Sequence, residues 1–291
     1  MIIDSKGNKW YKGNLHTHTT RSDGALSPDD SAKLYKSLGY DFLSFTDHWV
    51  KSETSEYEGM LLISGIEYDV FDGESCYHIV GHFLDNKPRL FIGCKPKEII
   101  SEIRRCGGTV TLAHPAWSLQ RPHEMAALDR VDFTEIYNSV SGYPYSARPY
   151  SGTLIDVAAM LGFKAVLTAV DDTHYYKEDA GRGFVYVKAD SLSPDSIREA
   201  LLRGDVLASE GPFAEWYVED GYFNVHIPGG CEHVQFFSPR CWNPDTTTRG
   251  GTVYDAKFKI KSDDFFVRAE IVGFDGKTAY TQYYFKDGGG K

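Results

Sequence analysis

The sequence predicts an α/β protein in which a sheet of mainly parallel strands, closed as a barrel or open, precedes a small β-rich, sandwich-like module. Two observations support this prediction. Short apolar runs alternate with capped helical patterns up to about residue 210. From Phe213 to Lys291 the chain has no Leu and no Met, is rich in aromatic residues, and alternates apolar with polar positions between Gly-rich turns. We therefore expect two domains, residues 1–212 and residues 213–291.

Three helices are predicted from their start and stop signals. Ser27 is an N-cap candidate followed by Pro28 and two aspartates, and Gly39 ends this pattern. The same signals recur from Ser193 to Gly204, and more loosely over 95–106. Short apolar runs predict strands over 41–45, 61–66, 79–80, 109–113, 132–137, 165–170 and 184–187, and the alternating run 252–260 predicts one in the tail.

The composition limits the possible classes of function. The formal net charge is −10, so the overall field repels polyanions and no extended nucleic-acid surface is expected. The N-terminus has no apolar signal-like segment, and no run approaches the roughly 18 apolar residues of a membrane span. We therefore expect a cytoplasmic protein. The five cysteines lack C-x-x-C spacing and are expected to be reduced, with a Cys231 to Cys241 link as the alternative.

Residues of the types that bind metal ions follow nearly every predicted strand. They are His16 and His18, Asp47 and His48, Glu67, His114, and Asp171, Asp172 and His174. The carboxyl ends of parallel strands converge on one face, so these side chains are expected to meet in one cleft. Side chains at i and i+2 of an extended segment point the same way and can hold one ion, and a carboxylate can bridge two ions. Imidazole with carboxylate suits Zn, Mn or Fe, and we expect two or three divalent ions.

A series of short motifs runs in order along residues 10–212. The motifs are Asn14-Leu-His16-Thr-His18 with Ser22-Asp23-Gly24, Phe45-Thr-Asp47-His48, Gly65-Ile-Glu67, Tyr77-His78-Ile-Val-Gly81, Ala113-His114-Pro115 and Asp172-Thr-His174. Together they resemble the successive motifs of the PHP (polymerase and histidinol phosphatase) superfamily. The opening Trp10-Tyr-Lys-Gly-Asn-Leu-His16 and the late Ala208-Ser-Glu-Gly-Pro212 are most similar to its CehA-like phosphoesterases. This resemblance implies a distorted (β/α)7 TIM-like barrel whose two- or three-metal cluster hydrolyses phosphate esters.

The resemblance also implies roles for single residues. One ion would be held by His16, His18, Glu67 and Asp172. Glu67 would bridge to a second ion held by His78 and His114, and a third would be bound by His48 and His174. Asp23 stands near the position of a further ligand in some members, although a Ser-Asp-Gly turn before a helix cap explains this residue equally well.

Several neighbouring residues compete for these places. Of His78 and His82 we favour His78, on which the motif falls, and expect His82 to be solvated or to lie behind a ligand. Asp47 should point away from His48 in an extended run and orient an imidazole through a hydrogen bond. The same alternation makes Asp171 an unlikely ligand. Glu135, at another strand end, is expected to be structural or to face the substrate.

The function expected from these residues is hydrolysis of a small phosphomonoester or nucleotide, or of an oligonucleotide end, by metal-activated water without a covalent intermediate. Arg21 and Arg148 are candidates for binding the phosphate oxygens, because guanidinium pairs with phosphate through two hydrogen bonds. Two rival functions remain. One is a metal-dependent hydrolase of carbamates, esters or lactones, and the other is a metal-containing binding protein whose aromatic-rich tail recognises a partner.

Overall fold

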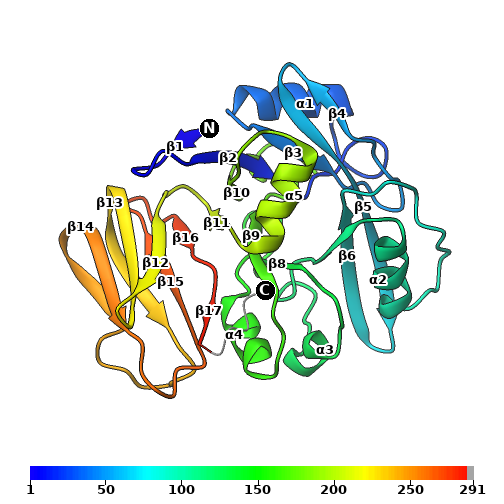
Figure 1. The fold of residues 1–291 in the computed structure, drawn as a ribbon. Helices are drawn as coiled ribbons and strands as arrows, with labels where there is room; N and C mark the ends of the chain where they lie inside the picture. The colour runs from blue at the N-terminus through cyan, green and yellow to red at the C-terminus, as the bar shows by residue number, and fades with distance from the viewer. Residues whose placement is uncertain (287–291) are drawn as a thin grey trace.

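A computed structural model describes residues 1–286, and Figure 1 shows a mixed α/β fold built on one large sheet. The strands before residue 212 are β1 (Ile2–Ile3), β2 (Lys9–Asn14), β3 (Phe42–Phe45), β4 (Ser55–Tyr57), β5 (Met60–Asp72), β6 (Ser75–His82), β7 (Thr109–Leu112), β8 (Phe133–Asn138), β9 (Val166–Val170), β10 (Phe184–Lys188) and β11 (Val206–Ser209). The helices are α1 (Pro28–Ser37), α2 (Pro96–Arg105), α3 (Pro122–Ala126), α4 (Gly152–Met160) and α5 (Pro194–Arg203).

The helices that begin with clear capping signals form where the sequence predicts them. The Ser27 hydroxyl accepts a hydrogen bond from the backbone N–H of Asp30 at the start of α1, and Ser193 caps α5 in the same way. Gly204 ends α5 in the left-handed conformation that glycine adopts without strain, with φ of 76°. Helices α3 and α4 were not predicted. In α4 the N-cap Ser151 makes no side-chain capping bond, so its start carries a weaker signal.

The sheet is only partly parallel, which corrects the sequence prediction. Strand β3 pairs in parallel with β2 and β5, and β8 pairs in parallel with β7 and β9. Strands β5 and β6 instead form a long antiparallel hairpin, and β6 also runs antiparallel to β7. The hairpin turns between Asp72 and Ser75, where Gly73 has a φ of 63°. The predicted strand 61–66 is therefore the first half of β5, and the predicted strand 79–80 lies in the second half of β6, both away from the turn.

Hydrogen-bonded pairing does not close the sheet into a barrel among the described residues. Strand β10 pairs with β2 and β11, but no ladder joins β9 to β10 or β11. The buried side chain of Gln282 fills this seam. Its carboxamide accepts from the N–H of Leu167 in β9 at 2.7 Å and donates to the carbonyls of Leu167 at 2.8 Å and Val206 in β11 at 3.2 Å. The amide thus supplies hydrogen bonds that a neighbouring strand would otherwise supply.

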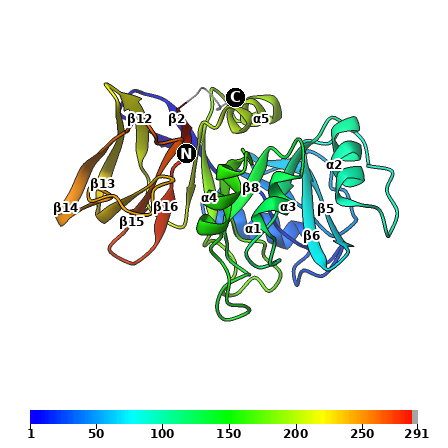
Figure 2. The ribbon, with the colours of Figure 1, turned by 90° about the horizontal axis from the view of Figure 1, so that it is seen from below.

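The strands after residue 212 are antiparallel. They are β12 (Glu215–Glu219), β13 (Tyr222–Phe237), β14 (Thr247–Lys259), β15 (Phe266–Val272), β16 (Thr278–Tyr280) and β17 (Tyr284–Phe285). Figure 2 shows β12–β16 on one side of the molecule and β5, β6 and α2 on the other. Their apolar cluster also includes Trp10 and Leu207, and β16 pairs with β11. The division at residue 212 stays a prediction.

Two further expectations concern the chain as a whole. None of the helices described within residues 1–286 is long and apolar enough to cross a bilayer. All five cysteines are free. Cys231 is buried and Cys241 is exposed, so the alternative of a link between them is not seen in the structure.

Candidate metal centre

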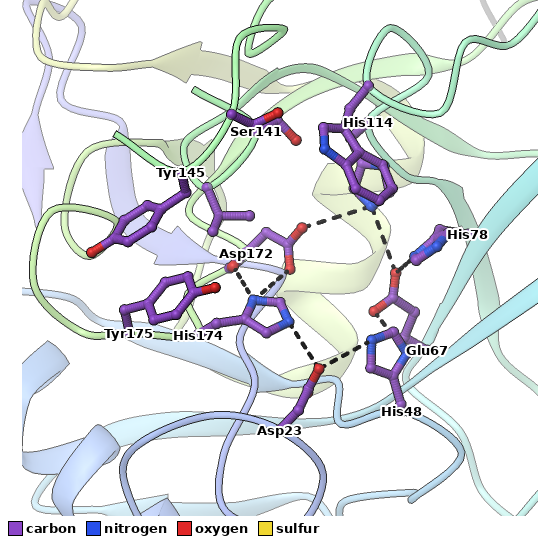
Figure 3. Close-up of a pocket in the computed structure, with 13 residues that line it drawn as sticks. Asp23, His48, Glu67, His78, His114, Ser141, Tyr145, Asp172, His174 and Tyr175 are labelled. Atoms are coloured by element: carbon purple, nitrogen blue, oxygen red, sulfur yellow. Dashed lines mark hydrogen bonds and ion pairs between the residues drawn. The ribbon is translucent and has the colours of Figure 1, made fainter. Parts of the chain in front are cut away.

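Most of the ligand-type residues that the sequence singles out line one cavity of about 340 Å³, shown in Figure 3, and the buried His16 and His18 contact Glu67 and Asp172 of its wall. They come from segments that follow β2, β3, β7 and β9, and from the β5–β6 hairpin. They form three groups whose donor atoms lie within 4.8 Å of one another. The groups are His16, His18, Glu67 and Asp172; Glu67, His78 and His114; and His18, Asp23, His48 and His174.

The first group is fully buried and closely packed. The Nε2 atoms of His16 and His18 lie 3.1 and 3.0 Å from Glu67 Oε2, and 3.2 and 3.1 Å from Asp172 Oδ1. Donors bound to one Zn²⁺ at about 2.0–2.2 Å lie roughly 3 Å apart in the same way. Asp172 Oδ1 is buried and has no hydrogen-bond partner among the described residues. Because lone pairs repel, this convergence is favourable only with a cation or protons between the donors, and the donor set fits a divalent metal ion.

The other two groups adjoin the first through shared residues. Glu67 Oε1 lies 2.8 Å from His78 Nδ1 and 3.8 Å from His114 Nε2, so the two carboxylate oxygens of Glu67 face different groups. Asp23 lies 3.4 Å from His18 Nδ1, 3.4 Å from His174 Nε2 and 3.8 Å from His48 Nε2. The sequence paired His48 with His174 and offered Asp23 as a further ligand, and in the structure Asp23 and His18 lie beside these two histidines.

The carboxylates of the site favour protons on His16 and His78. Burial lowers the pKa of His78, but the adjacent Glu67 carboxylate outweighs this effect and raises the pKa to about 10. For His16, burial is likewise outweighed by Asp172, Glu67 and Glu135, so its pKa lies well above the usual range. A metal ion would have to displace these protons, which makes metal binding weaker at low pH.

Glu135 contacts the nitrogen of His16 that faces away from the other donors of the first group, a role that the sequence left open. Its Oε1 lies 2.7 Å from His16 Nδ1, so a proton on Nδ1 leaves the Nε2 lone pair facing Glu67 and Asp172. Its Oε2 accepts from the backbone N–H of His114 and from Asn138 Nδ2, both at 2.8 Å. The only sequence signal for this role is its place at the end of a predicted strand.

Asp47 has a different role from the predicted one. Its buried carboxylate accepts hydrogen bonds from the N–H and hydroxyl of Thr19 and from the hydroxyl of Ser22, and it contacts no imidazole among the described residues. It therefore fixes the loop that carries Asp23. Asp171, as expected, is outside the three groups; it accepts from Tyr35 and from the N–H groups of residues 181–183.

Of the two places expected for His82, the solvated one is wrong, because the residue is buried. Its ring nitrogens lie 3.1 Å from Ser44 Oγ and 3.2 Å from Thr111 Oγ1, outside the three donor groups. Burial, with a smaller contribution from His16, lowers the pKa of His82 to about 3. The neutral imidazole is thus part of the interior packing, and of the two histidines only His78 reaches the cavity.

The rest of the cavity wall was not predicted. Arg21 and Arg148 are exposed, and neither lines the cavity. No other Lys or Arg of residues 1–286 lines it either. The remaining wall is aromatic and hydroxylic, and it is formed by Trp117, Val140, Ser141, Tyr145, Ser146 and Tyr175.

Comparison with known proteins identifies the fold. A two-domain protein from Bacteroides vulgatus, with a predicted PHP-like metal-dependent phosphoesterase, matches 98% of this chain over 98% of its own length, with a TM-score of 0.58 and 17% identity. The chain has the fold of this two-domain protein. The resemblance to PHP proteins inferred from the motifs is thus confirmed for the fold, and the CehA-like branch stays a prediction.

Two further solved structures overlap less. A protein from Bifidobacterium adolescentis described as a putative metal-dependent phosphoesterase covers 66% of this chain and 96% of its own, at a TM-score of 0.45 and 17% identity. An amidohydrolase from Chromobacterium violaceum with bound sulfate covers 67% of this chain and 96% of its own, at 0.44 and 16%. No family model and no curated protein matches the sequence.

Proposed function

We propose that the protein is a metal-dependent phosphomonoesterase that acts on a small phosphorylated molecule or nucleotide. The observation that carries this proposal is a buried cluster in which the Nε2 atoms of His16 and His18 lie 3.0–3.2 Å from carboxylate oxygens of Glu67 and Asp172. Two adjoining donor groups share Glu67 and His18 with it. Adjacent multi-metal sites of this composition are typical of enzymes that hydrolyse phosphate esters. On this proposal, residues 1–212 form an open variant of the PHP barrel, most similar to the CehA-like branch.

Each donor group would hold one divalent ion, Zn, Mn or Fe. Bound ions would supply an activated water and neutralise the charge that develops on the phosphate oxygens. The residues of the chain have supporting tasks. Glu135 keeps His16 Nε2 directed at Glu67 and Asp172, and Asp47 fixes the loop of Asp23. The hydroxyls of Ser141 and Ser146 are available to the phosphate or the leaving oxygen.

The test combines elemental analysis of protein purified without chelator with phosphate release from a panel of phosphomonoesters and nucleotides. We expect two or three equivalents of Zn, Mn or Fe, and turnover that is lost in His16→Ala and in the nearly isosteric Asp172→Asn. The surface variant His226→Ala, which loses an exposed histidine, is the matched control and should keep full activity. Less than one equivalent of metal, with no turnover after added metal, would refute the proposal.

A second candidate function is hydrolysis of neutral carbonyl esters, carbamates or lactones. The observation in its favour is that no Lys or Arg of residues 1–286 lines the cavity. The same metal chemistry attacks a carbonyl carbon, which needs no cation for phosphate oxygens. Turnover of benzyl acetate or a carbamate, with none of benzyl phosphate, would select this function.

A further inference from the structure

The cavity has an unusual charge distribution for a site that receives phosphate. Its charged lining residues are three carboxylates, Asp23, Glu67 and Asp172, together with histidines that the donor groups use. Bound divalent ions would balance these carboxylates and one phosphate group. No lysine or arginine in the described lining remains to pair with a second anionic group, and the chain as a whole carries a charge of −10. A second phosphate or carboxylate on the substrate would therefore find no lysine or arginine to pair with in the lining and would be repelled by the negative charge of the protein.

The mouth of the cavity is aromatic on two sides. Trp117 meets the rings of His78 and His114 edge-on, with centroids 5.6 and 5.0 Å apart. Tyr145 and Tyr175 stack on each other with centroids 4.1 Å apart and planes 12° from parallel. Figure 3 shows these tyrosines on the opposite side of Asp172 from His78 and His114. Tyr175 is 51% exposed and Trp117 is 39% exposed, so aromatic surface of both walls is accessible.

The tyrosine stack is close to the donor groups. Tyr175 directly follows His174, and the two ring centroids are 6.4 Å apart. A leaving group one ring wide, attached to a phosphate at the cluster, would reach the stack. An exposed aromatic face binds planar, uncharged groups through offset stacking and apolar burial.

From these observations we propose that the site selects monoesters whose leaving group is planar and uncharged, with Tyr145 and Tyr175 as specificity-determining residues. The inference rests on the proposed phosphomonoesterase function and narrows it. The preferred substrate carries one phosphate and an aromatic or heteroaromatic alcohol. Nucleoside polyphosphates and oligonucleotide ends, which carry further anionic groups, are disfavoured.

The test uses the metal-loaded protein and three substrates of similar size. Benzyl phosphate and cyclohexylmethyl phosphate have leaving alcohols of similar basicity but differ in aromaticity, whereas 4-carboxybenzyl phosphate adds one negative charge. We expect kcat/KM for benzyl phosphate to exceed the value for cyclohexylmethyl phosphate about fivefold and that for 4-carboxybenzyl phosphate about tenfold, the scale of one stacking or charge interaction. Calorimetric binding of benzylphosphonate and cyclohexylmethylphosphonate, which are not hydrolysed, should show the same preference.

Variants separate a specificity role from simple packing of the two loops. Tyr175→Leu should reduce the preference for the aromatic substrate to within about twofold and leave the metal content unchanged, whereas Tyr175→Phe should retain the preference. Tyr254→Leu, at a tyrosine of similar exposure outside the cavity, is the control. Equal turnover of all three substrates, or equal losses for the benzyl and cyclohexylmethyl esters in Tyr175→Leu, overturns the inference alone. No phosphate release from these three substrates or from the panel of phosphomonoesters and nucleotides, with metal bound, removes the proposed function as well.

Discussion

At the scale of single residues, the geometry of the donor groups depends on two carboxylates outside these groups, Glu135 and Asp47, which orient His16 and fix the loop of Asp23. Most candidate ligands were predictable because histidines and carboxylates at strand ends, some of them spaced two apart, can point into one cleft, whereas His78 and Asp23 followed only from the resemblance to PHP proteins. Glu135 was not assigned, because a glutamate at a strand end has the same local pattern whether it faces substrate, solvent or an imidazole. The error at Asp47 has a similar cause. Its alternation with His48 was inferred correctly, but its partners, Thr19 and Ser22, lie in a loop whose path the sequence did not predict.

Glu135→Gln tests this supporting role. The glutamine side chain has only one acceptor oxygen. If that oxygen keeps the hydrogen bonds from His114 N–H and Asn138 Nδ2, the amide NH2 faces His16 Nδ1 and cannot accept its proton, so the ring of His16 loses its fixed tautomer and orientation. We expect the affinity for metal to fall about 10- to 100-fold, measured by competition with a chromophoric chelator. Glu199→Gln, at an exposed position on α5, should leave the affinity unchanged. Unaltered affinity in Glu135→Gln would show that His16 is oriented by other contacts.

At the scale of elements, the segment between β8 and α4 links the cavity to the C-terminal strands. It carries Ser141, Tyr145 and Ser146, and it ends near Tyr150, whose hydroxyl donates to Glu270 in β15. Arg268, also in β15, is fully buried and bonds Asp156 in α4 through two hydrogen bonds of 2.7 Å. The sequence predicted helices with strong caps but could not predict this link, because it joins residues more than a hundred positions apart.

Tyr150→Phe tests the link by removing only its hydroxyl. We expect KM for a phosphomonoester to rise about threefold to tenfold, because the wall segment loses a hydrogen bond worth about 1 kcal/mol and the substrate must then order it. The metal content and kcat should change little. Steady-state kinetics with elemental analysis provide the measurement, and Tyr217→Phe, at an exposed tyrosine of β12, is the control. A loss of kcat with bound metal would place Tyr150 in the chemistry instead.

At the scale of the whole molecule, the fold class followed from strand and helix signals, but the path of the sheet did not. The hairpin of β5 and β6 depends on a turn at Gly73, and the local sequence pattern does not distinguish this turn from an ordinary loop. The seam between β9 and β11 depends on Gln282, far along the chain from both strands. Long-range packing of this kind leaves no local pattern in the sequence.

The pH dependence of stability provides a whole-molecule test through Glu210, which follows β11. Burial raises its pKa to about 7, although a hydrogen bond from the Tyr280 hydroxyl in β16 opposes the shift. Below about pH 4.5 the carboxyl is protonated in both states and costs nothing. As the pH rises to 7 and beyond, the unfolded chain gains from ionisation first, so stability falls, by at most about 3 kcal/mol.

We expect Glu210→Gln to be as stable as the parent near pH 4.5 and more stable near pH 8, in urea unfolding at several pH values. Glu219→Gln, at an exposed position in β12, should follow the parent throughout. If the free energy of unfolding falls equally for the parent and for Glu210→Gln between pH 4.5 and pH 8, the raised pKa of the buried Glu210 carboxyl is contradicted.

The amide of Gln282 has a consequence for how the protein is made. During synthesis β9 and β11 leave the ribosome before residue 282 is made, because Leu167 and Val206 precede Gln282 by 115 and 76 positions. Until then the backbone groups along the seam have only water as a partner, so the nascent chain cannot complete its interior. Completion of the sheet that carries the donor groups is thus coupled to synthesis of the segment between β16 and β17.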